Sequence, residues 1–204
     1  MTALKDYART VDLAARQDGV VTRQQLLRYG INPSSIPRML ADDTILAVAQ
    51  RGVYYVPALF DTMHGWHRVI WESLEPAMFT QEKLNDPIPV GVFSHYTAAE
   101  FHGAWDLPME SHLTRPTSRH VQRYTVHVDR LSPDDMCWID GLPVTTLERT
   151  TYDLGHMRLM DGEHRSRWML ELVEEHGWTI DRVCEVMGPD AVKESLPYYL
   201  EKVA

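Results

Sequence analysis

Apolar residues in the first part of the chain recur at helical spacing between short polar turns. Leu4, Tyr7, Val11 and Ala14 lie three or four residues apart, a pattern that predicts a helix with one apolar face. The Asp18-Gly19 pair that follows is typical of a turn. The sequence therefore predicts a first helix that ends just before this pair.

The next two segments carry helix start and stop signals. Thr22 stands three residues before Gln25, a capping box that begins a second helix, and Gly30 ends it. A third apolar-periodic segment contains Pro37, which a helix tolerates only in its first turn. We therefore expect the third helix to begin near the Ser34-Ser35 pair.

The third helix is predicted to have a buried face and a polar face. Ile36 and Met39 mark the buried side. The same spacing leaves Ser35, Arg38 and Ala41 facing outward. An arginine in the middle of an exposed helical face is a candidate for contacts with a polar ligand.

Strand-like residues follow the third helix. Residues 45–49 and 53–56 are rich in β-branched and aromatic side chains, and a Gln50–Gly52 turn separates them. Three helices followed by a hairpin, with arginines at exposed positions, are typical of a winged helix-turn-helix. The sequence predicts such a DNA-binding domain over residues 1–60.

The remaining residues, 61–204, mix strand and helix patterns. Apolar runs and strand-like alternation are found at residues 90–93, 112–114, 124–128 and 136–139. Helical spacing is found at residues 66–74, 97–102, 145–155, 163–175, 179–187 and 190–203. We predict a mixed α/β domain with a helical C-terminal tail, which makes the chain α+β.

Local signals predict where two helices of this second domain begin, end or bend. Thr145 and Glu148 form a second capping box, from which we expect a helix that closes at Gly155. Pro197 lies within the last helical segment, where we expect it to break or kink the helix.

The charge of the chain is distributed unevenly. Residues 1–60 carry seven basic and five acidic side chains, a net charge of +2, so the other residues carry −11 of the total of −9. The acidic total argues against a protein that coats nucleic acid generally, whereas a basic head on an acidic second domain suits a localised DNA contact. A mixed-charge helical domain without a ligand is the alternative interpretation.

Several classes of protein lack support in the sequence. No stretch has the length and hydropathy of a membrane span, and the N-terminus has no apolar signal core. Cys137 and Cys184 form neither a disulfide framework nor a metal-binding pair, which suits a reducing cytoplasm. No glycine-rich phosphate loop, nucleophile elbow, His-Glu-x-x-His or nuclease carboxylate pattern is present. We therefore expect no catalytic site, no cofactor and no metal ligands.

The candidate DNA contacts are polar residues of the second and third helices and of the hairpin. Arg38 is the best candidate for reading a base, because arginine donates two parallel hydrogen bonds to guanine in the major groove. Arg51 at the hairpin tip is suited to a minor groove or its backbone. The residues expected to orient the module on phosphates or at the helix start are Arg23, Gln24, Arg28, Ser34 and Ser35. A solvated surface arginine is the alternative for each.

A basic island interrupts the acidic second domain. Arg115, Arg119 and Arg123 belong to it, together with His120 and Arg130. A strand edge protected by charge explains the island, and binding of RNA, a nucleotide or a second stretch of DNA is the functional alternative. Glu148 and Arg149 follow in the first turn of a predicted helix, where we expect a mainly structural role with a surface role as the alternative.

The order of these motifs resembles the AbiEi-type antitoxins of type IV toxin–antitoxin systems, from about residue 19 to residue 155. In the first domain the similarity lies in residues 19–22, 29–31 and 51–54. In the second it lies in residues 93–99, 102–103, 112–114, 119–123, 126–128, 141–150 and 153–154. The block that begins Gly141-Leu142-Pro143 is the most specific of these.

The resemblance implies a DNA-binding antitoxin that represses its own operon. Its partners would be operator DNA and a nucleotidyltransferase-like toxin, which family members typically antagonise without a stable direct complex. Two alternatives remain. One is a winged-helix regulator whose acidic domain binds a small ligand or a protein, and the other is an enzyme, such as a nuclease, with a DNA-binding head.

Overall fold

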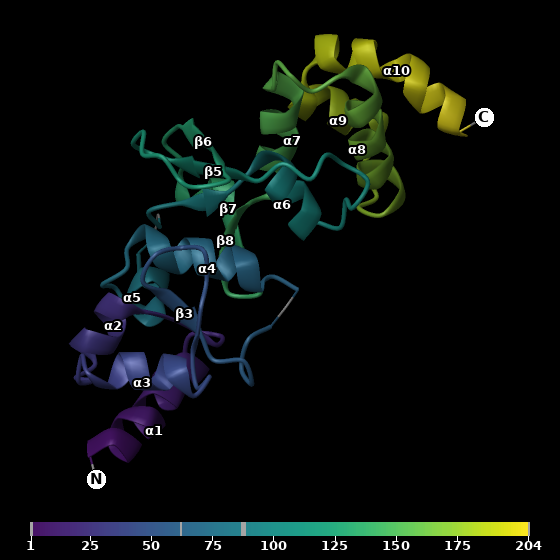
Figure 1. The fold of residues 1–204 in the computed structure, drawn as a ribbon. Coiled ribbons are helices and arrows are strands. Elements are labelled where there is room, and N and C mark those ends of the chain that lie inside the picture. Colours follow the sequence, from purple (N-terminus) through teal and green to yellow (C-terminus); the bar gives the residue numbers. More distant parts are fainter. Residues whose placement is uncertain (1, 62, 87–88, 204) are drawn as a thin grey trace. The chain divides into compact units, whose positions relative to one another are not determined.

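The computed structural model describes residues 2–61, 63–86 and 89–203. The chain divides into two compact units, Met1–Val90 and Gly91–Ala204 (Figure 1). Each unit contains helices and one β-sheet, which confirms the predicted α+β class. No helix among the described residues is long and apolar enough to cross a membrane.

The first unit is a winged helix with two further helices. Its helices are α1 (Thr2–Ala15), α2 (Arg23–Arg28), α3 (Ser35–Ala41), α4 (Gly65–Leu74) and α5 (Thr80–Leu84). Its strands are β1 (Val20–Thr22), β2 (Leu46–Ala47) and β3 (Val53–Tyr55), antiparallel in the order β1-β3-β2. In Figure 1, α1, α2 and α3 group around β3 in the purple and blue part of the chain. The predicted winged helix-turn-helix is confirmed. Its sheet has a third strand, β1, which the sequence pattern did not predict.

The predicted starts of α2 and α3 are confirmed. Thr22 is the N-cap of α2: its hydroxyl accepts from the Gln25 backbone N–H, and the Gln25 side chain accepts from the Thr22 N–H in return. The third helix begins at Ser35, so Pro37 lies in its first turn, where no backbone hydrogen bond is lost.

The predicted buried face of α1 is wrong in part. Leu4 and Val11 are exposed, whereas Asp6 and Leu13 are buried. The reason is that α1 packs through polar contacts as well as apolar ones. The Asp6 carboxylate accepts from the Ser35 hydroxyl at 2.6 Å, which ties α1 to the start of α3. Hydrophobic periodicity gives no sign of such a polar contact.

The turn after α1 requires glycine. Gly19 has a φ of +83°, which an L side chain rarely adopts, and a Cβ atom there would lie 2.6 Å from the backbone of Leu59. The close approach of these two backbones places β1 against the end of the hairpin, because the Val56 N–H donates to the Gly19 carbonyl.

A buried polar network joins α4 and α5 to the helix-turn-helix. The Gln25 side chain donates to the Glu72 carboxylate at 2.7 Å and to the Met78 carbonyl at 2.6 Å. Glu72, fully buried on α4, also accepts from Thr80 at 2.6 Å and from the Lys83 ammonium at 2.8 Å. Helices α4 and α5 therefore pack with the winged helix, and both belong to the first compact unit.

The second unit combines a mixed sheet with a helical C-terminal part. The strands are β4 (Val92–Phe93), β5 (His112–Arg115), β6 (Thr125–Val128), β7 (Met136–Ile139) and β8 (Leu142–Thr145). The helices are α6 (His95–Phe101), α7 (Leu147–His156), α8 (Gly162–Glu174), α9 (Ile180–Met187) and α10 (Pro189–Val203), with a 3-10 turn at Pro133–Asp135. The strand order is β6-β5-β4-β8-β7, in which β5 and β6 are parallel, as are β4 and β8.

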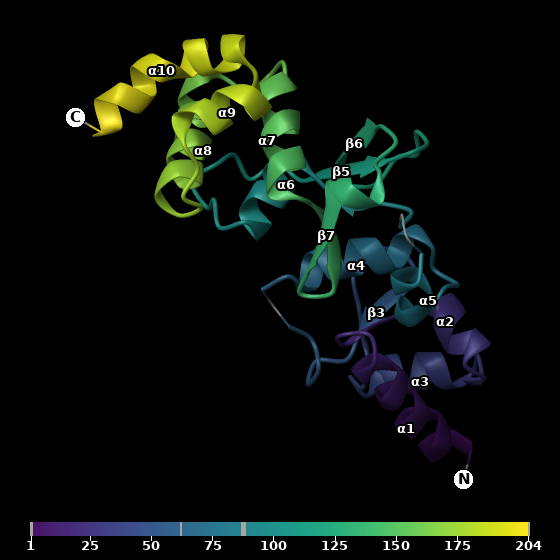
Figure 2. The same cartoon turned by 180° about the vertical axis from the view of Figure 1, so that it is seen from behind.

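The core of the second unit lies among its helices. Trp168, Met169 and Leu172 of α8 are fully buried and pack with residues of α6, α7, α9 and α10. Figures 1 and 2 show α8, α9 and α10 together in both views. A Cβ atom at Gly155 of α7 would lie 2.2 Å from the Met187 carbonyl, so glycine allows α9 to end against α7.

The predicted start of α7 is wrong by one residue. The N-cap of α7 is Thr146, whose hydroxyl accepts from the Arg149 N–H, because Thr145 still belongs to β8. Gly155 lies within α7, which ends one residue later at His156. The last helix has Pro197 inside it, so this proline does not end the helix.

The buried network makes a stability prediction. Glu72→Ala should lower the free energy of unfolding by about 3–5 kcal/mol, since it leaves the buried Lys83 ammonium without its carboxylate. Gln81→Ala, at an exposed position of α5, is the matched control and should have little effect. Urea unfolding of the full chain measures both. Equal stability of the two variants would show that the network does not hold α4 and α5 in place.

Candidate nucleic-acid interface and histidine–carboxylate cavity

The exposed face of the winged helix carries the predicted base-reading residue. Arg38 and Ala41 are exposed on α3, as predicted. Arg51 is exposed at the tip of the wing, next to Gly52, whose φ of +75° forms the turn. The Arg23 N–H donates to the Gly52 carbonyl at 2.7 Å, so the wing tip is held at the start of α2.

The other predicted DNA contacts differ in how accessible they are. Arg23, Gln24 and Ser34 are exposed. The prediction that Ser35 faces outward is wrong, because its buried side chain donates to Asp6. Ser34 donates to the Asn32 side chain, which shapes the turn before α3.

Arg28 is exposed but already bound within its own unit. Its guanidinium donates to both oxygens of Glu82 and to the Ala77 carbonyl at 2.9 Å. It also lies over the Phe79 ring, 4.6 Å from the centroid. A phosphate would have to compete with Glu82 for this side chain, so we expect a smaller contribution from Arg28 than from Arg38.

The charge contrast between the units is smaller than the first sixty residues suggest. Residues 61–90 add two basic and five acidic side chains, so the first unit carries −1 and the second carries −8 of the total of −9. Part of the added charge is neutralised in place, since Glu72 pairs with Lys83 and Glu82 pairs with Arg28. Positive charge at an interface must therefore come from a few local arginines.

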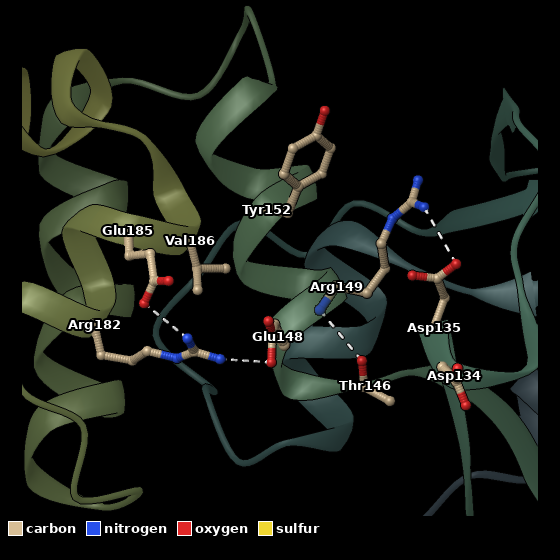
Figure 3. A pocket seen from close by; sticks show the side chains of 9 residues that line it. All are labelled: Asp134, Asp135, Thr146, Glu148, Arg149, Tyr152, Arg182, Glu185 and Val186. Atoms are coloured by element: carbon tan, nitrogen blue, oxygen red, sulfur yellow. Dashed lines mark hydrogen bonds and ion pairs between the residues drawn. The ribbon is translucent and has the colours of Figure 1, made fainter.

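The second unit has a cavity of about 700 Å³ at the start of α7 (Figure 3). It is lined by Asp134, Asp135, Thr146, Glu148, Arg149, Tyr152, Arg182, Glu185 and Val186. In Figure 3, Arg182 of α9 reaches across to Glu148 of α7, and both of its contacts, to Glu148 and Glu185, measure 2.8 Å. The predicted structural role of Glu148 is thus an ion pair between helices.

Arg149 forms ion pairs with three carboxylates. Its guanidinium pairs with Asp129, with Asp153 at 2.8 Å and with Asp135 at 3.8 Å. One positive charge therefore faces three negative ones, and the surroundings of Arg149 keep a net negative charge. The same guanidinium lies 5.6 Å from the centre of the Tyr152 ring.

A neighbouring cavity of about 470 Å³ contains a cluster of three histidines. His95 begins α6, His112 begins β5 and His127 lies on β6. The His112 Nδ1 and His127 Nε2 atoms are 2.8 Å apart, and the His95 and His127 rings stack with their centroids 3.5 Å apart. Asp153 of α7 lines the same cavity, with Arg149 beside it.

Burial controls the protonation of this cluster. It lowers the pKa of His112 and of His127 to about 4 each, and that of His95 to about 2. The neighbouring histidines lower the pKa of His95 further. Burial also raises the pKa of Asp153 to about 6, although the Arg149 guanidinium opposes this. At neutral pH the imidazoles are uncharged and Asp153 is mostly ionised.

The predicted basic island separates into two parts. Arg115 is buried on β5, so its side chain is not part of a surface patch. Arg119 and Arg123 are exposed, and Arg123 lines a surface hollow with His120. The accessible part of the island is therefore the loop between β5 and β6, together with the exposed Arg130 just after β6.

The histidine cluster was not predicted from the sequence. His102, seven residues after His95, is not part of the cluster, because its ring nitrogen contacts the Thr145 carbonyl at 2.8 Å. The partners of His95 lie on two strands that are paired in parallel, with Thr114 opposite His127. The histidines on these two strands indicate a cluster only once the pairing of β5 with β6 is known.

Comparison with known families supports the first unit's assignment. Residues 9–57 match the family described as transcriptional regulator, AbiEi antitoxin. The match spans the second half of α1, the rest of the helix-turn-helix and the wing, and it ends before α4. It confirms over this segment the resemblance to AbiEi-type antitoxins. No curated protein matches the chain.

The histidine cluster makes a prediction about acid stability. Unfolded histidines take up protons near pH 6.5, but His112 and His127 in the folded chain do so only near 4, so the unfolded state binds more protons in between. We expect the free energy of unfolding to fall as the pH drops from 6.5 to 4. Asp153 acts oppositely between 6 and 3.8, which offsets part of the loss.

Calorimetric unfolding across this pH range measures the effect. His127→Gln should make the stability less dependent on pH, because it removes one of the shifted groups. The matched control, His120→Gln, removes an exposed histidine outside the cluster and should keep the wild-type slope. The same slope in both variants would show that burial of the cluster does not govern acid stability.

Proposed function

We propose, from the family match of residues 9–57, that this chain is a DNA-binding antitoxin that represses the operon encoding it and its toxin. The family is one of antitoxin transcriptional regulators, which is a regulatory and not an enzymatic role. Repression of its own operon, and a nucleotidyltransferase-like toxin as the counterpart, go beyond the match and follow from the resemblance. A protein that binds operator DNA in this way works in the cytoplasm.

The observation that carries the proposal is the exposure of Arg38 on α3. The helix is held at its start by Asp6 from α1 and contributes Ile36 and Met39 to the core, so its position is fixed. Among the described residues, the Arg38 side chain has no hydrogen-bond or ion-pair partner. It is therefore available to a base edge in the major groove, while Arg51 extends from the wing.

Antitoxicity is proposed for the second unit. The resemblance to AbiEi-type antitoxins includes residues 93–103 and 141–154, which form α6, β8 and most of α7. The second unit has a charge of −8, so DNA repels it as a whole. Two of its exposed arginines, Arg119 and Arg123, are suited to a local contact with RNA, a nucleotide or a protein. No stable complex with the toxin is required.

A ligand-responsive regulator is the second candidate. The cavity of about 700 Å³ at the start of α7 favours it, since it is of the size that small-molecule sites occupy. A neighbouring gene for a nucleotidyltransferase-like protein supports the antitoxin, whereas a neighbouring metabolic operon supports the ligand-responsive regulator.

Arg38→Ala should weaken operator binding by about 1–3 kcal/mol and relax the preference at one base pair. The physical reason is the loss of a paired hydrogen bond to a base edge. Gel-shift titrations with the full chain on the upstream region of its own operon measure the change. Arg16→Ala is the matched control, because Arg16 is exposed just after the end of α1 and forms an ion pair with Asp12 of that helix. Operator affinity that is equal in the two variants excludes α3 as the recognition helix.

Arg119→Ala with Arg123→Ala should reduce rescue from the toxin and leave operator repression unchanged. The loop between β5 and β6 loses its exposed positive charge in this variant, while the winged helix keeps its own. Growth during co-expression of the toxin, with a blot for equal protein levels, measures rescue, and a promoter fusion measures repression. Lys193→Ala with Lys202→Ala, two exposed lysines of α10, is the matched control. Full rescue by the arginine variant would exclude this loop from antitoxicity.

A further inference from the structure

We propose that His95, His112 and His127 bind one divalent transition-metal ion of the Zn²⁺ type, with the Asp153 carboxylate beside them. One ring nitrogen from each histidine lies within 4.8 Å of the others. The three residues come from α6, β5 and β6, and the parallel pairing of β5 with β6 brings the two strand histidines to one place. Imidazole nitrogen is a preferred ligand of Zn²⁺, and three histidines with one open position form a recurring zinc site.

Two buried polar atoms at this place have no hydrogen-bond partner among the described residues. They are Nε2 of His112 and Oδ2 of Asp153, and both residues line the cavity of about 470 Å³. The side chains that face these two atoms lie beyond hydrogen-bond length: Oε2 of Glu110 is 3.6 Å from Nε2 of His112, and Nδ1 of His95 is 3.9 Å from Oδ2 of Asp153. Buried polar atoms are normally paired, so two orphaned polar atoms in one cavity point to a missing ligand, and an imidazole nitrogen and a carboxylate oxygen are both atoms that bind a cation.

The local charge favours a divalent cation. Arg149 is the cationic side chain nearest to Asp153, and it also pairs with Asp129 and Asp135. Its single charge is already balanced by these carboxylates, with a surplus of two negative charges. In the lining of the cavity itself, the carboxylates of Glu110, Asp129 and Asp153 outnumber the guanidinium groups of Arg149 and Arg158 by one. A doubly charged ion therefore enters a negative site in spite of the nearby guanidinium.

Neighbouring residues orient the cluster. His95 has a φ of +53°, a strained backbone conformation for a non-glycine residue, and such strain is concentrated at functional sites. Its Nδ1 lies 3.0 Å from the Ser94 hydroxyl, which leaves Nε2 for an ion. Thr114 in turn donates to Ser94 at 2.8 Å. This is the arrangement in which an outer residue fixes a ligating imidazole.

Because two of the rings are stacked, a side chain must move when the ion binds. A metal lies near the plane of each imidazole that holds it, whereas the His95 and His127 rings are nearly parallel, 10° apart, and face one another. At least one of these rings must therefore turn about its side-chain torsions. His127 is half-buried on the outer strand β6, so its ring has more room to turn than that of His95.

The test is a calorimetric titration of ZnCl₂ into the full chain, freed of tags and treated with a chelator. We expect one ion per chain. His112→Gln and His127→Gln should each weaken binding by at least about ten-fold, because each removes a ligand. His156→Gln is the matched control: His156 lines the same cavity but lies outside the cluster, and its loss should leave the affinity within about two-fold.

Each outcome decides the proposal. Wild-type protein that binds no Zn²⁺, or cluster variants that bind it as the wild type does, overturn it. Circular dichroism checks that the variants fold. If they do not, the visible absorption of Co²⁺ bound to the wild type decides: a four-coordinate spectrum with nitrogen ligands supports the site, and the spectrum of the hydrated ion refutes it. Operator binding is measured separately, so failure of the metal site leaves the proposed function untouched.

Discussion

The side chain of Gln25 holds the first unit together. Its oxygen accepts from the Thr22 N–H and from Gln17, and its nitrogen donates to Glu72 and to the Met78 carbonyl. Gln25, which belongs to the capping box of α2, thereby also attaches α4 to α2. Without an acceptor on α4, this buried amide would lose a hydrogen bond that no water replaces. The geometry of the helix-turn-helix is thus coupled to residues beyond the segment that matches the family.

A polar contact also places the recognition helix. Asp6 of α1 accepts from the Ser35 hydroxyl at the start of α3, while Met39 packs into the core from the same helix. The carboxylate lies near the positive end of the helix, where a negative charge is stabilising. The exposed position of Arg38 follows from both contacts, because together they fix which face of α3 is left to solvent.

The starts of α2 and α3 could be predicted from the sequence because their signals are local. The Thr22–Gln25 box and Pro37 act through neighbouring backbone groups, so their consequences can be read within one turn of helix. Asp6 and Glu72 could not be placed in this way, because a buried carboxylate is indistinguishable from a solvated one until its partner is known. The cluster of His95, His112 and His127 could not be predicted for the same reason, since it depends on the register of β5 and β6.

Arg149 links the two cavities of the second unit. It lines both, and the aspartates that it pairs with are divided between them, with Asp135 in one and Asp129 and Asp153 in the other. An anion that drew the guanidinium toward Asp135 would weaken its hold on Asp153 and make the histidine cavity more negative. Conversely, a cation beside Asp153 would compete with Arg149 for that carboxylate and free the guanidinium for the neighbouring cavity. The charge of each cavity therefore depends on how one guanidinium is shared among three carboxylates.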